Sequence, residues 1–190
     1  MDTHKNIIKI ILFSTVLSII FLLVFLPVKN TYSQIVSEVK SNDLVDLANN
    51  ERSAAGLSTL KYDLNLQMAA IAKAEDMAKN DYFEHYTPNG DAPWKFMIDN
   101  NYIYEVAGEN LAIDFNNSKN INNAWMASPT HKTNILNPDY ENIAIATKED
   151  NFQGRKTIIV VEMFGKKSKD LSATINLVYY KVRSLLGLDL

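Results

Sequence analysis

The chain has 190 residues, of which 47% are hydrophobic, and a formal net charge of −3 from 22 acidic and 19 basic residues. That length and apolar content predict one domain of about 100–150 residues with further segments attached to it. The basic residues are scattered, which argues against a nucleic-acid partner, and the absence of cysteine excludes disulfides, thiolate metal sites and cysteine nucleophiles.

The first predicted element is a membrane segment near the amino terminus. Residues 10–26 (IILFSTVLSIIFLLVFL) are 17 uncharged residues that follow Lys5 and Lys9, and a Lys9 side chain that snorkels towards the interface would lengthen this apolar run. A cleavable signal peptide favours a shorter run and small residues at the cut, for which Thr31-Tyr32-Ser33 is the best candidate. We predict that residues 1–27 form an uncleaved signal anchor, with the remaining chain outside the cytoplasm at the cell membrane. Secretion after cleavage is the alternative.

Two helices are predicted after a polar stalk at residues 28–42. The first ends at Gly56, a residue suited to the left-handed conformation that closes many helices. Its apolar residues at helical spacing are Leu44, Leu47, Ala48 and Ala55. The second helix is capped by Asp63 and leaves Lys73 and Asp76 outside its apolar face. That face consists of Leu66, Ala70, Ala74, Met77 and Ala78.

The next stretch predicts three more helices around a turn. Pro93 is placed to start a helix over residues 94–100, and residues 108–110 are predicted as a Gly-led acidic turn. A further helix opens at Ser118. One face of it carries Ile121, Ala124, Trp125 and Ser128. The Ser-Pro pair at 128–129 then starts a short helix, with His131 in its first turn.

The carboxyl-terminal third has a different pattern. Residues 142–147 and 157–164 are rich in β-formers and are separated by a polar loop at 148–155, which predicts an antiparallel hairpin. Helices followed by a hairpin indicate an α+β domain over residues 43–165. In residues 166–190, a seven-residue apolar repeat too short for a coiled coil predicts an amphipathic helix. This helix could pack on the domain, on a partner or on a membrane surface.

Three polar residues form the candidate site: His85, Glu109 and His131. Two neutral imidazoles and a carboxylate are sufficient ligands for a divalent transition metal, most often zinc, and the same groups can transfer protons near neutral pH. The spacing alone does not bring them together, since the histidines are far apart and no local metal motif is present. The alternative is three unrelated groups: His85 and Glu109 in turns, and His131 solvated at a helix start.

Six motifs follow one another between residues 43 and 165. They are Asn50-Glu51-Arg52 with Ala55-Gly56-Leu57; Leu66 with Ala69, Ala72 and Met77; Phe83-x-His85-x-x-Pro88-x-Gly90; Ala107-Gly108-Glu109-Asn110-Leu111-Ala112; Trp125-x-x-Ser128-Pro129-x-His131-x-x-Asn134-Ile135-Leu136; and Phe164-Gly165. As a set they resemble the CAP superfamily of cysteine-rich secretory, antigen five and pathogenesis-related proteins, also called the SCP domain, in its bacterial exported form. The resemblance implies an α-β-α sandwich, with a central antiparallel sheet between helical layers and a cleft on one face.

The resemblance also implies a ligand set for that cleft. In the family, two histidines and two glutamates line the cleft and can hold zinc or another divalent cation; His85, Glu109 and His131 match three of the four. Ser128 stands at the position of the second glutamate and is a poor metal ligand beside a carboxylate. Glu162, on the last predicted strand, would compensate only if its side chain pointed into the cleft. We therefore predict a cleft lined by His85, Glu109, His131 and Ser128, in which the first three residues hold any metal.

Three functions are compatible with these features. The first is a non-catalytic, membrane-tethered binding module outside the cytoplasm, whose cleft takes a small apolar ligand, an envelope component or a protein partner. The second is a hydrolase in which a His-bound metal activates water and Glu109 acts as base. The third is a structural component of an envelope or spore assembly. The binding module is favoured because the motifs contain no strong nucleophile. Trp125 is predicted to pack in the core beneath the cleft rather than to contact a ligand.

Overall fold

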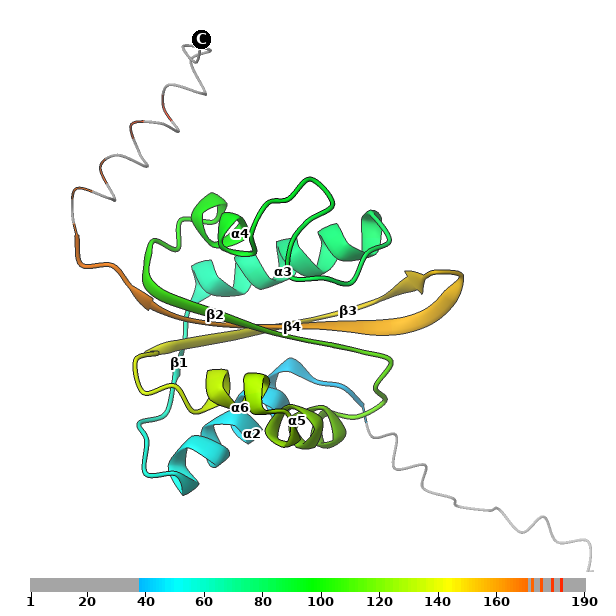
Figure 1. Cartoon of the computed structure of the whole chain (residues 1–190), viewed down its shortest axis with the longest axis horizontal. Coiled ribbons are helices and arrows are strands. Elements are labelled where there is room, and N and C mark those ends of the chain that lie inside the picture. Colours follow the sequence, from blue (N-terminus) through cyan, green and yellow to red (C-terminus); the bar gives the residue numbers. More distant parts are fainter. Residues whose placement is uncertain (1–37, 171, 173–174, 176–178, 180–181, 183–190) are drawn as a thin grey trace, which may run out of the picture. The chain divides into compact units, whose positions relative to one another are not determined.

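The computed structural model describes residues 38–170, 172, 175, 179 and 182 (Figure 1). The elements are α2 (Ser41–Ala54), β1 (Lys61–Tyr62), α3 (Leu64–Lys79), α4 (Trp94–Asp99), β2 (Tyr104–Ile113), α5 (Ser118–Ala127), α6 (Pro129–Ile135), β3 (Asn142–Phe152) and β4 (Arg155–Lys167). The predicted signal anchor at residues 1–27 lies outside the described residues. Among those residues, no helix combines the length and apolar character needed to cross a membrane.

A four-stranded sheet in the order β1-β3-β4-β2 forms the middle of the domain. β4 pairs antiparallel with β3 on one side and with β2 on the other, while the two-residue β1 adds a short parallel pair to β3. Helices α3 and α4 cover one face of the sheet, and α2, α5 and α6 cover the other (Figure 1). The predicted α+β fold, with a sheet between helical layers, is confirmed for the described residues.

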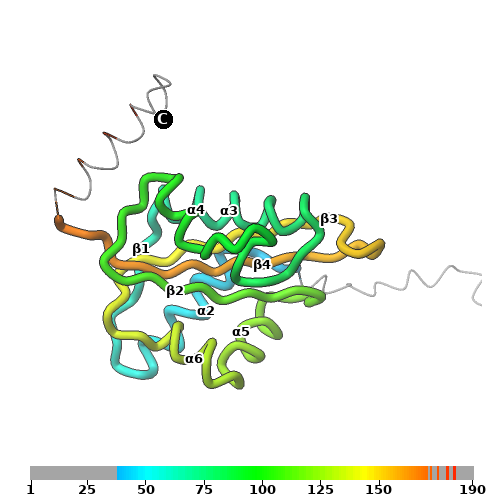
Figure 2. The backbone as a smooth tube through the Cα atoms, turned by 45° about the horizontal axis from the view of Figure 1, so that its top comes forward, coloured from blue at the N-terminus to red at the C-terminus, as the bar shows by residue number. Residues whose placement is uncertain are grey.

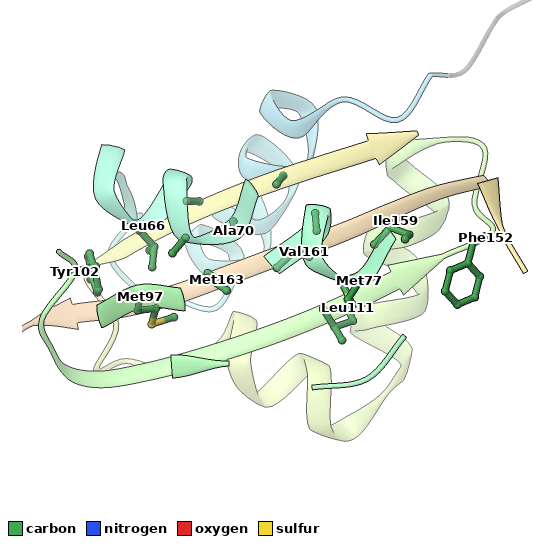
Figure 3. Close-up of a cluster of buried hydrophobic side chains, with 14 residues drawn as sticks. Leu66, Ala70, Met77, Met97, Tyr102, Leu111, Phe152, Ile159, Val161 and Met163 are labelled. Carbon is green, nitrogen blue, oxygen red and sulfur yellow. The ribbon is translucent and has the colours of Figure 1, made fainter. Parts of the chain in front are cut away.

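Each face of the sheet buries its own hydrophobic cluster. Towards α3 and α4 lie Leu66, Met77, Met97, Leu111, Ile159, Val161 and Met163, among others (Figure 3). Towards α2, α5 and α6 lie Leu44, Ile121, Trp125, Ile135, Ile143, Ile145, Val160 and Phe164, among others. Side chains alternate between the two faces along a strand, so β4 is buried on both sides. This burial explains its nearly continuous apolar sequence.

The predicted turn at residues 108–110 is wrong, because these residues lie in the middle of β2. Gly108 is required for packing rather than for a turn: a Cβ at this position would lie 2.2 Å from the hydroxyl oxygen of Tyr140. β2 forms the edge of the sheet between the α3–α4 layer and the α5–α6 layer (Figure 2). The consecutive polar residues Glu109 and Asn110 therefore face opposite sides of the sheet, where their surroundings differ.

The predicted position of Lys73 outside the apolar face of α3 is also wrong, since its side chain is completely buried. The cap of the same helix is confirmed: the Asp63 carboxylate accepts hydrogen bonds from the backbone N–H groups of Asn65 and Leu66. Tyr102 lies in the core without exposed surface.

The hairpin is confirmed, but its loop is much shorter than predicted. β3 continues through the polar residues to Phe152, and only Gln153 and Gly154, both with positive φ, make the turn. Residues 148–151 can form a strand although they are polar, because this end of β3 is largely exposed and does not need apolar side chains. Beyond β4, the described residues 172, 175, 179 and 182 are helical and exposed.

Candidate functional site

A hydrogen-bonded pair of His85 and Glu109 lies at the edge of the sheet. His85 belongs to the segment between α3 and α4, and Glu109 is central in β2. The imidazole Nδ1 lies 2.7 Å from Oε1 of the carboxylate; the His85 side chain is 51% exposed and that of Glu109 only 1%. A buried carboxylate therefore orients an imidazole that remains accessible to solvent.

The two groups of this pair shift each other's protonation. The hydrogen bond to Glu109 raises the pKa of His85, against the opposing effect of partial burial. Burial raises the pKa of Glu109, while the hydrogen bond from His85 and the positive charge of Lys73 oppose that rise. The second carboxylate oxygen, Oε2, is buried and has no hydrogen-bond partner, so the pair retains one unused acceptor.

Lys73 is a residue of this site that was predicted to lie outside the apolar face of α3 because it is charged. Its Nζ donates to the backbone oxygens of Glu84 and His85, at 2.8 Å each, and to the Tyr82 hydroxyl at 3.2 Å. Burial lowers the pKa of Lys73, and the negative charge of Glu109 counteracts this. Lys73 thus holds the backbone that carries His85 and balances the buried charge of Glu109. Its spacing with Leu66, Ala70 and Met77 already placed it on the inner face of α3.

His131 lies across the β2 edge from the pair. It occupies the first turn of α6, as predicted, and is partly exposed. Partial burial lowers its pKa, and the positive charge of His85 lowers it further, so the two imidazoles interact electrostatically. Ser128 precedes α6, but its hydroxyl hydrogen-bonds to the Thr130 hydroxyl rather than to either imidazole or to Glu109.

Glu162 does not supply the missing carboxylate of the cleft. It pairs with Asn110 across the β2–β4 ladder, and Asn110 faces the opposite side of the sheet from its neighbour Glu109. Glu162 is completely buried and accepts a 2.8 Å hydrogen bond from Asn110 Nδ2. Burial raises the pKa of Glu162 to about 8, although the hydrogen bond from Asn110 lowers it.

Side chains of the α5–α6 layer cap the free edge of β2. The backbone oxygens of residues 107, 109 and 111 accept hydrogen bonds from Tyr140 Oη, Asn134 Nδ2 and Trp125 Nε1, respectively. These caps protect the edge strand from pairing with another chain. Trp125 is buried, which confirms the predicted core position.

A cavity of about 340 Å³ opens beside the His85–Glu109 pair. Its lining consists of His85, Tyr86, Pro93, Trp94, Ala107, Gly108, Glu109 and Asn134. A second hollow, of about 370 Å³, shares His85 and Tyr86 with it. Neither lining includes His131 or Ser128. The combination of aromatic walls and a few directed polar groups is typical of small-molecule sites.

The described residues do not form a ready-made metal centre. No three His, Asp or Glu side chains among them are arranged to hold one ion, and Nδ1 of His85 is already engaged by Glu109. What the geometry provides is an oriented imidazole, a buried acceptor oxygen and an aromatic wall.

The comparison with protein families matches this fold and motif order. The model of the CAP family, described as the cysteine-rich secretory protein family, matches residues 45–164, more than half of the chain. The chain belongs to the CAP family. It is 35% identical over 122 residues to the uncharacterized protein YkwD of Bacillus subtilis, covering 63% of this chain and 48% of that protein. It is 26% identical over 110 residues to the uncharacterized membrane protein YlbC of the same organism, covering 58% and 32%. The CAP chain thus spans half or less of these curated relatives.

Solved structures share the fold of this CAP domain. An extracellular protein containing a SCP domain from Bacillus anthracis superposes with a TM-score of 0.60 at 24% identity, covering 67% of this chain and 40% of that one. An outer surface protein from Borrelia burgdorferi gives a TM-score of 0.57 at 24% identity, covering 67% and 92%. At these identities the likeness shows the fold alone.

Proposed function

We propose that this protein is a non-catalytic binding module tethered to the membrane outside the cytoplasm, and that the cavity beside His85 and Glu109 takes an envelope component. The observation that carries the proposal is the 340 Å³ cavity, in which Tyr86 and Trp94 supply apolar walls next to the oriented His85 imidazole. A ligand for it combines an apolar face with hydrogen-bonding groups. Sugar rings have both, because their C–H faces stack on aromatic side chains while their hydroxyls bond to polar groups.

The location outside the cytoplasm rests on the sequence and on the names of relatives. Residues 10–26 have the length and composition of a signal anchor. Similar proteins are named as a membrane protein, an extracellular protein and an outer surface protein. Reading the mature amino terminus directly tests the tether: a chain that begins after residue 30 would be secreted rather than anchored.

Binding is favoured over hydrolysis by what surrounds the imidazoles. In the described part of the chain, no Ser or Thr hydroxyl hydrogen-bonds to His85 or His131: the Ser128 hydroxyl bonds to Thr130, and Thr87 Oγ1 accepts from the Asp91 backbone. A serine-type reaction would need such a contact to activate the nucleophile. Release of products from a bound ligand would contradict the proposal.

Tryptophan fluorescence tests ligand binding, because the chain has only two tryptophans and one lines the cavity. A Trp125→Phe background leaves Trp94 as the only emitter. In the full chain, titration with oligosaccharides of N-acetylated amino sugars should change Trp94 emission saturably, and Tyr86→Ala should weaken that binding at least tenfold. Tyr62→Ala is the matched control, since Tyr62 is 60% and Tyr86 62% exposed, and Tyr62 lies on β1 at the other edge of the sheet. A response to fatty acids instead of saccharides would assign an apolar ligand.

The predicted zinc site at His85, Glu109 and His131 is tested separately. Equilibrium dialysis of the full chain against zinc measures the occupancy, and a His85→Ala/His131→Ala double variant shows whether these residues hold the ion. Because the three side chains are not arranged around one point, we expect most zinc to be lost on dialysis against metal-free buffer. One tightly held zinc per chain would show that binding rearranges the pair.

A further inference from the structure

Glu162 is a buried ionisable group, and no charged side chain among the described residues forms an ion pair with it. It lies in the centre of β4, between Asn110 of β2 and Ile145 of β3 in the ladder. Oε2 accepts one hydrogen bond from Asn110, and Oε1 has no partner. An ionised carboxylate in such a place would be strongly destabilising, whereas a protonated acid carries no net charge.

Ionisable groups that the helices bring to this face of the sheet make other contacts. Glu51, from α2, accepts a hydrogen bond from Asn122 Nδ2. The guanidinium of Arg52, from α2, donates hydrogen bonds to the backbone oxygens of Ser58, Ile135 and Asn137. His131, from α6, contributes its backbone oxygen rather than its ring to the neighbouring network. Burial raises the pKa of Glu162, and the hydrogen bond from Asn110 opposes that rise. Burial therefore favours the neutral form of the carboxyl.

Asn110 connects this carboxyl to both walls of the cleft. Its Nδ2 donates to Glu162 Oε2 at 2.8 Å and to the His131 backbone oxygen at 3.2 Å. Its Oδ1 accepts from Asn134 Nδ2, which also donates to the Glu109 backbone oxygen. One side-chain amide thus joins β4, β2 and α6, and its two amide hydrogens have separate acceptors.

We propose that Glu162, as a protonated acid, is a positioning residue of the cleft: it anchors Asn110 and thereby holds α6, with His131, against β2, with Glu109. When the carboxyl loses its proton to water, an uncompensated negative charge is left in the core. The charge is relieved only if α6 moves away and admits solvent. Since burial raises the pKa of Glu162 to about 8, we expect α6 to move away from the sheet under mildly alkaline conditions. The inference goes beyond the proposed function, because it holds whichever ligand the cavity takes.

Amide hydrogen exchange of the full chain in a mild detergent tests the proposal without any ligand. Glu162→Gln keeps an oxygen acceptor for Asn110 but has no proton to lose. The protection of α6 amides in the wild type, relative to Glu162→Gln at the same pH, should fall about tenfold for each pH unit above the pKa of Glu162. Glu75→Gln, on the exposed surface of α3, should follow the wild type. An identical pH course in wild type and Glu162→Gln overturns the proposal.

A second measurement covers the case in which Glu162→Gln does not fold. The ¹³C shift of the Glu162 side-chain carboxyl in the wild type reports its protonation directly. We expect the protonated value at pH 7 and a transition at higher pH. A carboxyl that is already ionised at pH 6 overturns the proposal, and neither result bears on whether the cavity binds a ligand.

Discussion

The two faces of the sheet bury acidic residues in opposite ways. On the α3 side, Glu109 is hydrogen-bonded to the imidazole of His85 and interacts electrostatically with the buried ammonium of Lys73. On the α6 side, Glu162 has only the neutral amide of Asn110. The accessible cavity lies at the β2 edge beside the compensated Glu109, and Asn134 of α6 also lines it. A buried carboxylate such as Glu109 can thus lie next to the hydrophobic core when a buried cation such as Lys73 compensates its charge. On the other face, the uncharged network of Asn110 and Glu162 holds α6 against the sheet.

The largest expected effect comes from removing the countercharge. Lys73→Met keeps the bulk and helix propensity of the side chain, but it leaves the backbone oxygens of Glu84 and His85 without their donor and Glu109 without a positive charge. Lys73 and Glu109 interact electrostatically without direct contact, and the removal of one of two interacting buried charges costs about 3–5 kcal/mol. Urea denaturation of the full chain measures the loss. Lys79→Met, exposed in the last turn of the same helix, should change the free energy of unfolding by less than about 0.5 kcal/mol.

A Lys73→Met loss as small as that of Lys79→Met would mean that the countercharge is dispensable. The two faces would then not differ in the way that their geometry indicates. A large loss with an unchanged His85 environment, followed by NMR, would separate the charge of Lys73 from its role in holding the loop.

On the α6 face, the buried and uncompensated Glu162 predicts that the free energy of unfolding depends on pH. The folded-state pKa of Glu162 is raised to about 8 from the ordinary value of 4.5, so folding takes up a proton between these values. Its stabilising contribution is complete below about pH 4.5 and is lost as the pH rises to about 8. The difference in unfolding free energy between Glu162→Gln and wild type should therefore shift in favour of the variant by about 1.4 kcal/mol per pH unit in this window. A difference independent of pH from 5 to 8 would mean that Glu162 is ionised in the folded protein.

Most helices and the hairpin follow from local sequence, whereas β1 and β2 do not, and the layered arrangement was expected from the family resemblance. Helix starts at Asp63 and Ser118 and the β-rich runs of the hairpin have local chemical signals, and all of them are confirmed. β2 was interpreted as a turn because Gly108 and the polar residues after it are typical of loops. A glycine is needed at position 108 because the Tyr140 side chain packs directly against it. These two residues are far apart in the sequence, so a local sequence pattern could not predict their contact.

The candidate site was predicted in part for a similar reason. The contact between His85 and Glu109 agrees with the expectation from motif order, whereas Ser128 makes no contact with them. Lys73 was misplaced because a charged residue was assigned to solvent. Its burial depends on backbone oxygens of a loop that folds back over α3, and no periodicity in the helix reveals those acceptors.

Each face of the sheet has a glycine, Gly108 or Gly165, against which a tyrosine ring packs closely. A Cβ at Gly108 would lie 2.2 Å from the Tyr140 hydroxyl oxygen, and one at Gly165 would lie 2.6 Å from both Oη and Cε1 of Tyr102. We expect Gly108→Ala and Gly165→Ala to cost about 1–3 kcal/mol each through overpacking. Double-mutant cycles distinguish them. Tyr140→Phe should relieve part of the first loss, because it removes the 2.2 Å contact and leaves Cζ at 2.8 Å, whereas Tyr102→Phe should relieve less of the second, because Cε1 remains at 2.6 Å. Equal relief on both faces would contradict the geometry.

The smallest effect is the order in which the two cleft histidines titrate. The hydrogen bond to Glu109 raises the pKa of His85, while burial and the charge of His85 lower that of His131. NMR titration of the imidazole Cε1–H signals, assigned with His85→Gln and His131→Gln, should therefore place His85 above 6.5 and His131 below it. Glu109→Gln should lower the pKa of His85 and bring the two values closer, since the carboxylate is the cause of the separation. His85 is half exposed, so the stability linked to its proton, present below pH 6.5 and lost as the pH rises through its folded pKa, should be under about 1 kcal/mol. Titration in the reverse order, or no response to Glu109→Gln, would mean that the pair does not form in solution and that the cavity lacks its oriented imidazole.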